Sequence, residues 1–385
     1  MRFNTVSEWR AFWKNSIDLG LSRIREVGDR LGVLKPNCPV ITVAGTNGKG
    51  TTVFGLEAVY HQSGYKTGVF SSPYLYHFNE EIRIGASNIS DKALCESFEA
   101  VNQACEQIEL TIYEAKCLAA LYCFQQRQVD VIILEVGLGG RLDATNVVDA
   151  DVAVMTSVGL DHQEFLGHTR EAIAREKMGV VRKGSVFVCG DPNPPSVIEE
   201  MTSQLKTKNY FISEEEKFPL NHFAIKKVVE SLQEKLPVYQ GLLGEVLERL
   251  QLPGRLETTR GDFLEIKDVA HNVDSVRVLS EYIGRQGVSG KTHAVFSMLN
   301  TKDIQSVVDI IKPSIDFWYI APVDDDRAMQ VDDIKEVLIE SGVKNIATYE
   351  SISEAYQSAK EAAIKNDLLL SFGSFCVLRG VSLKN

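Results

Sequence analysis

The chain has 385 residues, more than a common single domain, and this length predicts two domains that each bury a core of their own. Its formal net charge of −11 argues against general nucleic-acid binding, which requires a basic face. A content of 44% hydrophobic and 24% charged residues is typical of a globular enzyme.

No feature of the sequence predicts a membrane partner. No apolar run approaches the ~20 residues that span a bilayer. Residues 1–16 lack the uninterrupted apolar stretch of a secretory signal. The seven cysteines form no C-x-x-C pair, and we expect them to be reduced thiols. We therefore expect a cytoplasmic protein.

The first half of the chain alternates between short apolar runs, which predict strands, and longer periodic segments, which predict helices. Strands are expected at residues 39–45, 66–73, 129–137, 149–159 and 184–190. Helices are expected at residues 51–64, 90–105, 112–126 and 169–181. This alternation predicts a parallel sheet with helices on both faces, and ligands at the carboxyl ends of its strands.

The second half changes character before the alternation returns. Residues 190–221 are turn-rich and charged, and no strong strand is predicted there. A helix is expected at residues 221–236, and a hinge around Gly254. Further strands are expected at residues 262–268, 291–298, 314–321, 344–349 and 367–373. We predict an α/β fold, with a P-loop-type, mainly parallel sheet domain at residues 1–257 and a smaller Rossmann-like domain at residues 258–385.

Residues 40–52, VITVAGTNGKGTT, place a glycine-rich turn between a strand and a helix. A strict Walker A loop would have glycine at Val43 and a hydroxyl residue at Gly50. A phosphate at this turn would still gain the helix N-terminal N–H groups, and Lys49 could reach its outer oxygens. The pattern favours a nucleotide loop, with a glycine-rich turn bearing a solvated lysine as the alternative.

Polar side chains follow other predicted strands at the same edge of the sheet. Ser72 and Glu135 come at the ends of two strands, and Asp161 with His162 follow a third. Taken singly, each could be an ordinary turn residue or a charge facing water. Because they converge with Lys49 on one sheet edge, an ATP–metal site is the better interpretation.

Other residues keep two interpretations open. Asp143 and Arg141 could contact a substrate or pair with each other. Lys177 lies within a predicted helix, where the local pattern favours a solvated surface lysine. His162 with His168 could suggest zinc, but no cysteine lies nearby to complete such a site, so zinc is disfavoured.

These motifs together resemble the bacterial dihydrofolate synthase/folylpolyglutamate synthase family of the Mur ligase superfamily. The resemblance runs from residue 18 to about residue 376, through DLGLSRI, VAGTNGKGTT, SSPYL, LTIYEA, LEVGLGGRLDATNVVDADVAV, LDHQEFLG, REKMG, LPGRLE, DVAHN and FGSF. The phosphate loop of this superfamily reads G-T-N-G-K-G-[ST], which explains the departure from Walker A.

The resemblance implies ATP and Mg²⁺ as cofactors, with a monovalent cation as a further candidate. The residues implied for ATP are Thr46, Asn47, Gly48, Lys49, Gly50, Thr51, Asn221, Arg255, Asp268 and His271. Those implied for the metal are Ser72, Glu135 and His162. Lys177 matches a lysine that is carbamylated in the family, and it is expected to be catalytic together with Lys49 and His162.

The implied substrates are small molecules: dihydropteroate, reduced folates and L-glutamate. The pterin is expected at Thr111, Ile112, Tyr113, Glu114, Leu142, Asp143 and Ala144. The implied reaction transfers the ATP γ-phosphate to the substrate carboxylate, and the amino group of glutamate attacks the resulting acyl phosphate. We expect a monomer that binds neither nucleic acid nor membrane.

Three alternatives stay open at this point. The chain could be a folylpolyglutamate synthase without dihydrofolate synthase activity. A peptidoglycan Mur ligase is disfavoured because only 44 residues precede Gly45, too few for its UDP-binding domain. An inactive nucleotide-binding protein would have no need of the metal positions.

The chain also departs from the family at Tyr74, usually His, and at Glu81, usually Arg, which suggests a lost positive charge near the substrate.

Overall fold

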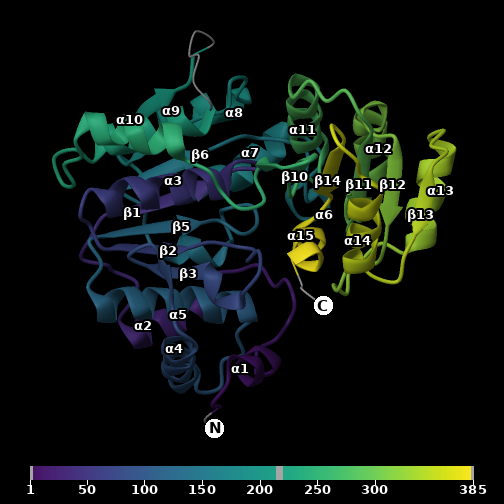
Figure 1. Cartoon of the computed structure of the whole chain (residues 1–385). Helices are drawn as coiled ribbons and strands as arrows, with labels where there is room; N and C mark the ends of the chain where they lie inside the picture. Colours follow the sequence, from purple (N-terminus) through teal and green to yellow (C-terminus); the bar gives the residue numbers. More distant parts are fainter. Residues whose placement is uncertain (1–2, 214–219, 383–385) are drawn as a thin grey trace. The chain divides into compact units, whose positions relative to one another are not determined.

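The computed structural model describes residues 3–213 and 220–382, which fall into two compact units divided between Leu250 and Gln251 (Figure 1). Each unit holds a mainly parallel sheet with helices on both faces. The α/β architecture predicted from the alternation is therefore confirmed.

The first unit contains an eight-stranded sheet in the order β4-β3-β2-β5-β1-β6-β7-β8. Its strands are β1 Val40–Ala44, β2 Thr67–Phe70, β3 Ile82–Ile84, β4 Ser87–Asn88, β5 Val131–Glu135, β6 Val152–Met155, β7 Val186–Cys189 and β8 Lys208–Phe211. The six strands β2, β5, β1, β6, β7 and β8 pair in parallel, whereas β3 pairs antiparallel with both β2 and β4. Strands β2, β5, β1 and β6 are consecutive neighbours, so their carboxyl ends share one edge.

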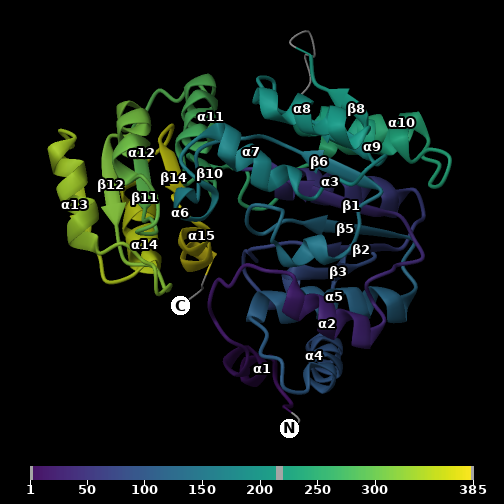
Figure 2. The same cartoon turned by 180° about the vertical axis from the view of Figure 1, so that it is seen from behind.

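Helices cover both faces of this sheet (Figures 1 and 2). They are α1 Val6–Phe12, α2 Ser22–Leu31, α3 Lys49–Gln62, α4 Asp91–Cys105, α5 Ile112–Arg127, α6 Gln163–Leu166, α7 Arg170–Met178, α8 Ser196–Leu205, α9 Leu220–Ser231 and α10 Gln240–Arg249, with short 3₁₀ helices η1 Phe78–Glu81 and η2 Ala144–Val147. Alternate strand residues point to opposite faces. Ile41 and Ile133 therefore pack under α3, α9 and α10, whereas Ile132 and Leu134 pack under α2, α4 and α5.

The expectation of no strong strand within residues 190–221 is wrong. Lys208–Phe211 forms β8, which pairs in parallel with β7 at the edge of the sheet. Its side chains are exposed or half-buried. Because such a strand can consist of polar residues, its sequence lacks the continuous apolar run by which buried strands are predicted. Part of the same segment, residues 214–219, lies outside the described residues.

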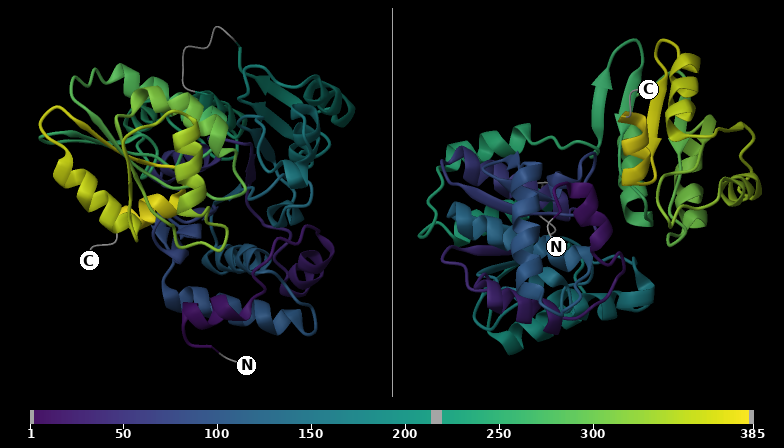
Figure 3. Two further views of the ribbon diagram at one scale, coloured as in Figure 1. Left: turned by 90° about the vertical axis from the view of Figure 1, so that its right-hand side faces the viewer. Right: turned by 90° about the horizontal axis from the view of Figure 1, so that it is seen from below.

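The second unit, drawn in green and yellow in Figure 3 (left), contains a six-stranded sheet whose order is β13-β12-β11-β14-β10-β9. Its strands are β9 Glu257–Arg260, β10 Leu264–Lys267, β11 Thr292–Phe296, β12 Phe317–Ile320, β13 Ile346–Thr348 and β14 Leu368–Phe372. Its helices are α11 Val273–Arg285, α12 Ile304–Ile311, η3 Lys312–Ser314, α13 Val331–Glu340, α14 Ile352–Ala362 and α15 Phe375–Ser382. Only β9 runs antiparallel among these described strands, and it pairs with β10.

No helix in the described ranges combines the length and the apolar character needed to cross a membrane. All seven cysteines fall within the described ranges and are free thiols.

Candidate active site

The glycine-rich loop joins β1 to α3, as its sequence predicted. Gly48 precedes the first residue of α3 in the left-handed conformation, with φ 82°. A side chain there would be strained and would meet Asn221 Oδ1 at 2.6 Å. Since glycine brings no capping side chain, the first-turn N–H groups of α3 form a positively polarised helix end suited to an anion.

A second loop, directly after β6, braces the glycine-rich loop. The Thr46 N–H donates to the Ser157 carbonyl at 2.9 Å, and the Asn47 N–H donates to Ser157 Oγ at 3.0 Å. Thr156 Oγ1 donates back to the Asn47 carbonyl at 2.7 Å. Sequence reasoning missed Thr156 and Ser157, although two hydroxyl residues directly after a strand were an available signal.

Asn221, predicted to bind ATP from a distant part of the sequence, lies beside this loop. Thr52 Oγ1 donates to Asn221 Oδ1 at 3.3 Å and to the Gly48 carbonyl at 3.1 Å. Gly50 and Thr51, in the first turn of α3, are half-buried. The structure therefore brings residues 46–51 and Asn221 together.

Two lysine side chains share one carbonyl in this loop. Lys49 Nζ donates to the carbonyls of Gly45, at 3.0 Å, and Thr46, at 3.3 Å. Lys177 Nζ, from α7, also donates to Gly45 at 3.0 Å. The local interpretation of Lys177 as a solvated surface lysine is wrong, because only 4% of the residue is exposed. Burial, followed by repulsion from the Lys49 ammonium, lowers the pKa of Lys177 to about 7.

The three residues predicted for the metal lie at the carboxyl ends of β2, β5 and β6. Glu135 is the buried last residue of β5, and Ser72 follows β2. His162 adopts a left-handed conformation, with φ 51°, and its N–H donates to Asp161 Oδ1 at 2.9 Å. β2 and β5 are neighbours and β1 alone separates β5 from β6, so the parallel strands direct all three positions to one edge of the sheet.

The donor set at this edge fits Mg²⁺ better than a metal held by protein alone. Among the described residues, no group of three or more His, Cys, Asp or Glu side chains could hold a metal. Mg²⁺ needs few protein ligands, because it keeps several waters and uses one or two carboxylates with substrate phosphates. Glu135 with the Ser72 hydroxyl, beside a phosphate loop, meets that requirement.

The first predicted pterin segment begins α5. Thr111 and Glu114 form a reciprocal capping box, in which the Thr111 N–H donates to Glu114 Oε2 at 2.8 Å. The Glu114 carboxylate also pairs with Arg23 at 3.1 Å. Ile112 packs against the core, and Tyr113 is the residue of this segment that interacts with the second pterin segment.

The second predicted pterin segment, residues 142–144, is organised by Asp143. Its buried carboxylate accepts the N–H groups of Gly137, at 3.1 Å, and Leu138, at 2.9 Å, and the Tyr113 hydroxyl at 3.4 Å. Burial raises the pKa of this carboxyl. Leu142 is half-buried and Ala144 begins η2. Arg141 pairs with Glu176 at 3.0 Å, so its suggested pairing with Asp143 is wrong.

In the second unit, the predicted ATP residues lie near one another on the loops around β10. Asp268, directly after β10, accepts the N–H groups of Leu256 and Ala270, each at 2.7 Å. The Arg255 guanidinium lies 5.0 Å from the Phe375 ring centroid. His271 Nδ1 lies 2.7 Å from the Val269 carbonyl, two residues before it. The Asp268 carboxylate thus holds its own turn.

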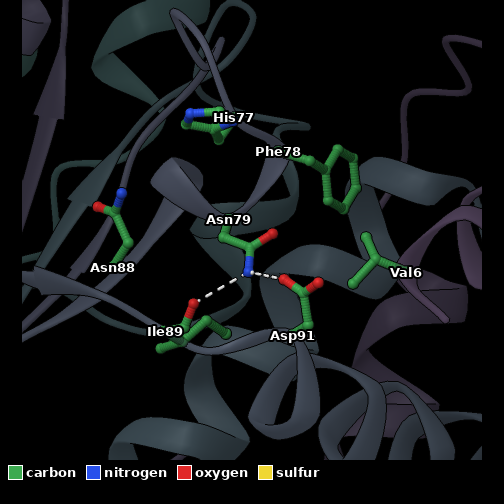
Figure 4. Close-up of a pocket in the computed structure, with 7 residues that line it drawn as sticks. All are labelled: Val6, His77, Phe78, Asn79, Asn88, Ile89 and Asp91. Atoms are coloured by element: carbon green, nitrogen blue, oxygen red, sulfur yellow. Dashed lines mark hydrogen bonds between the residues drawn. The ribbon is translucent and has the colours of Figure 1, made fainter. Parts of the chain in front are cut away.

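A surface pocket of the first unit contains none of the predicted site residues (Figure 4). It is lined by Val6, His77, Phe78, Asn79, Asn88, Ile89 and Asp91. Asn79 Nδ2 donates to the Ile89 carbonyl at 3.0 Å and to Asp91 Oδ1 at 2.6 Å, which ties η1 to the start of α4 (Figure 4). This pocket is therefore distinct from the candidate site at the carboxyl edge.

Comparisons with known proteins agree with this geometry. Residues 43–256 match the Mur ligase middle domain, and residues 254–375 match the Mur ligase, glutamate ligase domain. The dihydrofolate synthase/folylpolyglutamate synthase of Escherichia coli (strain K12) is 36% identical over 397 residues, covering 96% of this chain and 93% of that protein.

Two solved structures are similar over nearly the whole chain. E. coli FolC in complex with DHPP and ADP has a TM-score of 0.90 and 35% identity, covering 98% of this chain and 97% of that one. A bifunctional folylpolyglutamate synthase/dihydrofolate synthase with Mn, AMPPNP and L-glutamate bound gives a TM-score of 0.90, 35% identity and the same coverage.

Proposed function

Since the chain belongs to the Mur ligase family, in the group of the dihydrofolate synthase/folylpolyglutamate synthases, and is an ATP-dependent ligase, we propose folate ligation as its function. It joins L-glutamate to 7,8-dihydropteroate, giving dihydrofolate, and adds γ-linked glutamates to reduced folates. The observation that carries this proposal is the convergence of Lys49, Ser72, Glu135 and His162 on one edge of a parallel sheet.

The chemistry explains why cations gather at this edge. A carboxylate resists attack by an amine because its carbon is shielded by negative charge. Transfer of the ATP γ-phosphate makes an acyl phosphate, which the glutamate amine attacks with release of phosphate. The first step brings two anions together, so catalysis depends on positioning and on neutralising charge.

The phosphate loop supplies the protein's share of that neutralisation. The N–H groups at the start of α3, between Thr46 and Thr51, bind the ATP phosphates, with Asn221 beside them. Lys49 stabilises the outer phosphate as a point charge. Ser72, Glu135 and His162 hold Mg²⁺, which when bound withdraws charge from the phosphate oxygens.

Lys177 is suited to become a carbamate. Its pKa of about 7 leaves a large neutral fraction near pH 7. A neutral amine can attack CO₂, forming an N–C bond and releasing one proton. The product is an anion beside Lys49, which replaces the repulsion between two ammonium groups by attraction. Lys177 therefore acts in this proposal as an additional anionic group of the site.

The remaining predicted residues complete the proposal. Residues 111–114 and 142–144 hold the pterin, through Tyr113 and Asp143 in particular. Arg255 binds ATP from the end of the domain predicted at residues 1–257, and Asp268 and His271 bind it from the domain predicted to begin at residue 258. We infer that the enzyme is monomeric and takes only small-molecule substrates.

A substrate panel tests this proposal. Phosphate release is measured with ATP and L-glutamate, adding dihydropteroate, tetrahydrofolate or a UDP-muramyl peptide in turn. We expect release with both pteridines. Release with tetrahydrofolate alone would leave only the folylpolyglutamate synthase activity, and release with neither pteridine would overturn the proposal.

A further inference from the structure

A buried ion pair links the segment after β2, which carries the proposed metal-binding residue Ser72, to α5, which begins with the first proposed pterin segment. Glu81 ends η1 and pairs with Lys116, which lies on α5 one turn after Tyr113. Glu81 is 2% exposed and Lys116 is 7% exposed. Since Lys116 contacts Glu81 directly, the negative charge at position 81 is neutralised by another part of the chain.

Glu81 holds the loop that carries Ser72 from both sides. The Ser71 N–H donates to the Glu81 carbonyl at 3.0 Å, and the Tyr74 N–H donates to Glu81 Oε1 at 3.3 Å. The main chain and side chain of one residue thus bracket Ser72. A shift of Glu81 would therefore move the proposed metal-binding hydroxyl.

Lys116 connects the same bracket to the pterin segments. Its ammonium lies 5.1 Å from the ring centroid of Phe78 and 5.8 Å from that of Tyr113. The Tyr113 hydroxyl donates to Asp143 Oδ1 at 3.4 Å, and the nearby Ser72 side chain partly offsets the rise that burial causes in the pKa of Tyr113. Glu81 thus holds the residues on either side of Ser72 and pairs with Lys116, whose ammonium lies over the Tyr113 ring.

The geometry points to Glu81 and Lys116 as a positioning pair that sets the place of Ser72 relative to α5, and so couples metal binding to pteridine binding. This inference rests on the proposed function. A buried ion pair is often replaceable by apolar residues without loss of stability. We therefore expect the main effect of this pair on the geometry of the site rather than on folding.

The chain offers a matched control. Glu57, on α3, is 3% exposed and pairs with Arg83, at 2.9 Å, in the same unit. Glu57→Gln and Glu81→Gln are the same chemical change at two buried ion pairs, but the Glu57 carboxylate accepts from Arg83 Nε rather than from the segment around Ser72. The double variant Glu81→Gln/Lys116→Met removes both charges of the pair, and so leaves no buried charge uncompensated.

The test measures Mn²⁺ binding in the presence of AMPPNP by calorimetry, the KM for dihydropteroate, and the melting temperature. We expect Glu81→Gln to weaken Mn²⁺ binding about 10-fold, as for other residues that orient metal ligands, and to raise the KM for dihydropteroate. The double variant should regain the melting temperature of the wild type. Its Mn²⁺ affinity should stay low and its KM for dihydropteroate high, because the link to α5 is absent.

Two results would overturn the inference. The first is a double variant in which Mn²⁺ affinity and the KM for dihydropteroate recover together with the melting temperature. The second is a Glu57→Gln variant whose Mn²⁺ affinity and KM change as much as those of Glu81→Gln. If Glu81→Gln does not fold, the double variant carries the same test. A wild-type protein that neither turns over dihydropteroate nor binds Mn²⁺ with AMPPNP would overturn the proposed function as well.

Discussion

The two units use the carboxyl ends of their strands in different ways. In the first unit, two lysine amino groups, those of Lys49 and Lys177, share the Gly45 carbonyl. In the second, the Asp268 carboxylate is occupied by two backbone N–H groups of its own turn. Two lysine side chains held at one carbonyl indicate a site prepared for an anion, whereas a carboxylate that accepts backbone N–H groups of its own turn holds its loop in place.

Among the substitutions that test this difference between the two units, Lys49→Ala should have the largest effect on activity. Lys49→Ala should lower glutamate-dependent ADP formation by about 10²–10³-fold, because a preorganised contact to developing charge is lost. The control is Lys183→Ala, at an exposed lysine of the same unit, with folding checked by circular dichroism. Normal turnover by Lys49→Ala would remove Lys49 from the mechanism.

Lys177 gives an intermediate effect with a defined pH dependence. Because its pKa is lowered to about 7, from 10.5 as its ordinary value, the unfolded chain binds more protons than the folded chain between those pH values. The free energy of unfolding therefore rises with pH across that window. The destabilisation caused by burying Lys177 has its full size below pH 7.

Lys177→Met should remove this cost. In CO₂-free buffer, we expect the variant to melt roughly 5 °C higher than the wild type at pH 7, with a gain that shrinks towards pH 10, while turnover is lost. Calorimetric scans at several pH values measure the difference. A gain that grows with pH would contradict the burial of an uncharged amine at this position.

The smallest expected effect is at Asp268. Asp268→Asn keeps one acceptor and places an NH₂ group against the second N–H donor, which costs about 1–3 kcal/mol of local stability. Hydrogen exchange should speed up at Leu256 and Ala270, with exchange in the first unit unchanged. Faster exchange throughout the first unit, or none at these two amides, would contradict a local role for Asp268.

The sequence predicts the fold of the first unit well, because buried parallel strands are short apolar runs that are easy to recognise. It also predicts the positions of Lys49, Ser72 and His162, which come after such strands, and of Glu135, which ends one. Strand β8 was not predicted, because an edge strand with exposed side chains needs no apolar run.

Residues whose environment depends on distant contacts could not be predicted from local pattern. Lys177 looks like a surface lysine among charged neighbours, and the carbonyl that holds it belongs to Gly45. Glu81 looks like an unpaired carboxylate until the packing of α5 places Lys116 beside it. In both cases the missing information is tertiary, and only the structure supplies it.

The most direct test of the central claim is the fate of carboxylate oxygen. Dihydropteroate labelled with ¹⁸O in its carboxylate is incubated with enzyme, ATP and L-glutamate, and the released phosphate is analysed by mass spectrometry. An acyl phosphate mechanism predicts one ¹⁸O atom in each phosphate, with ADP as the nucleotide product. Unlabelled phosphate, or label in AMP, would contradict the account.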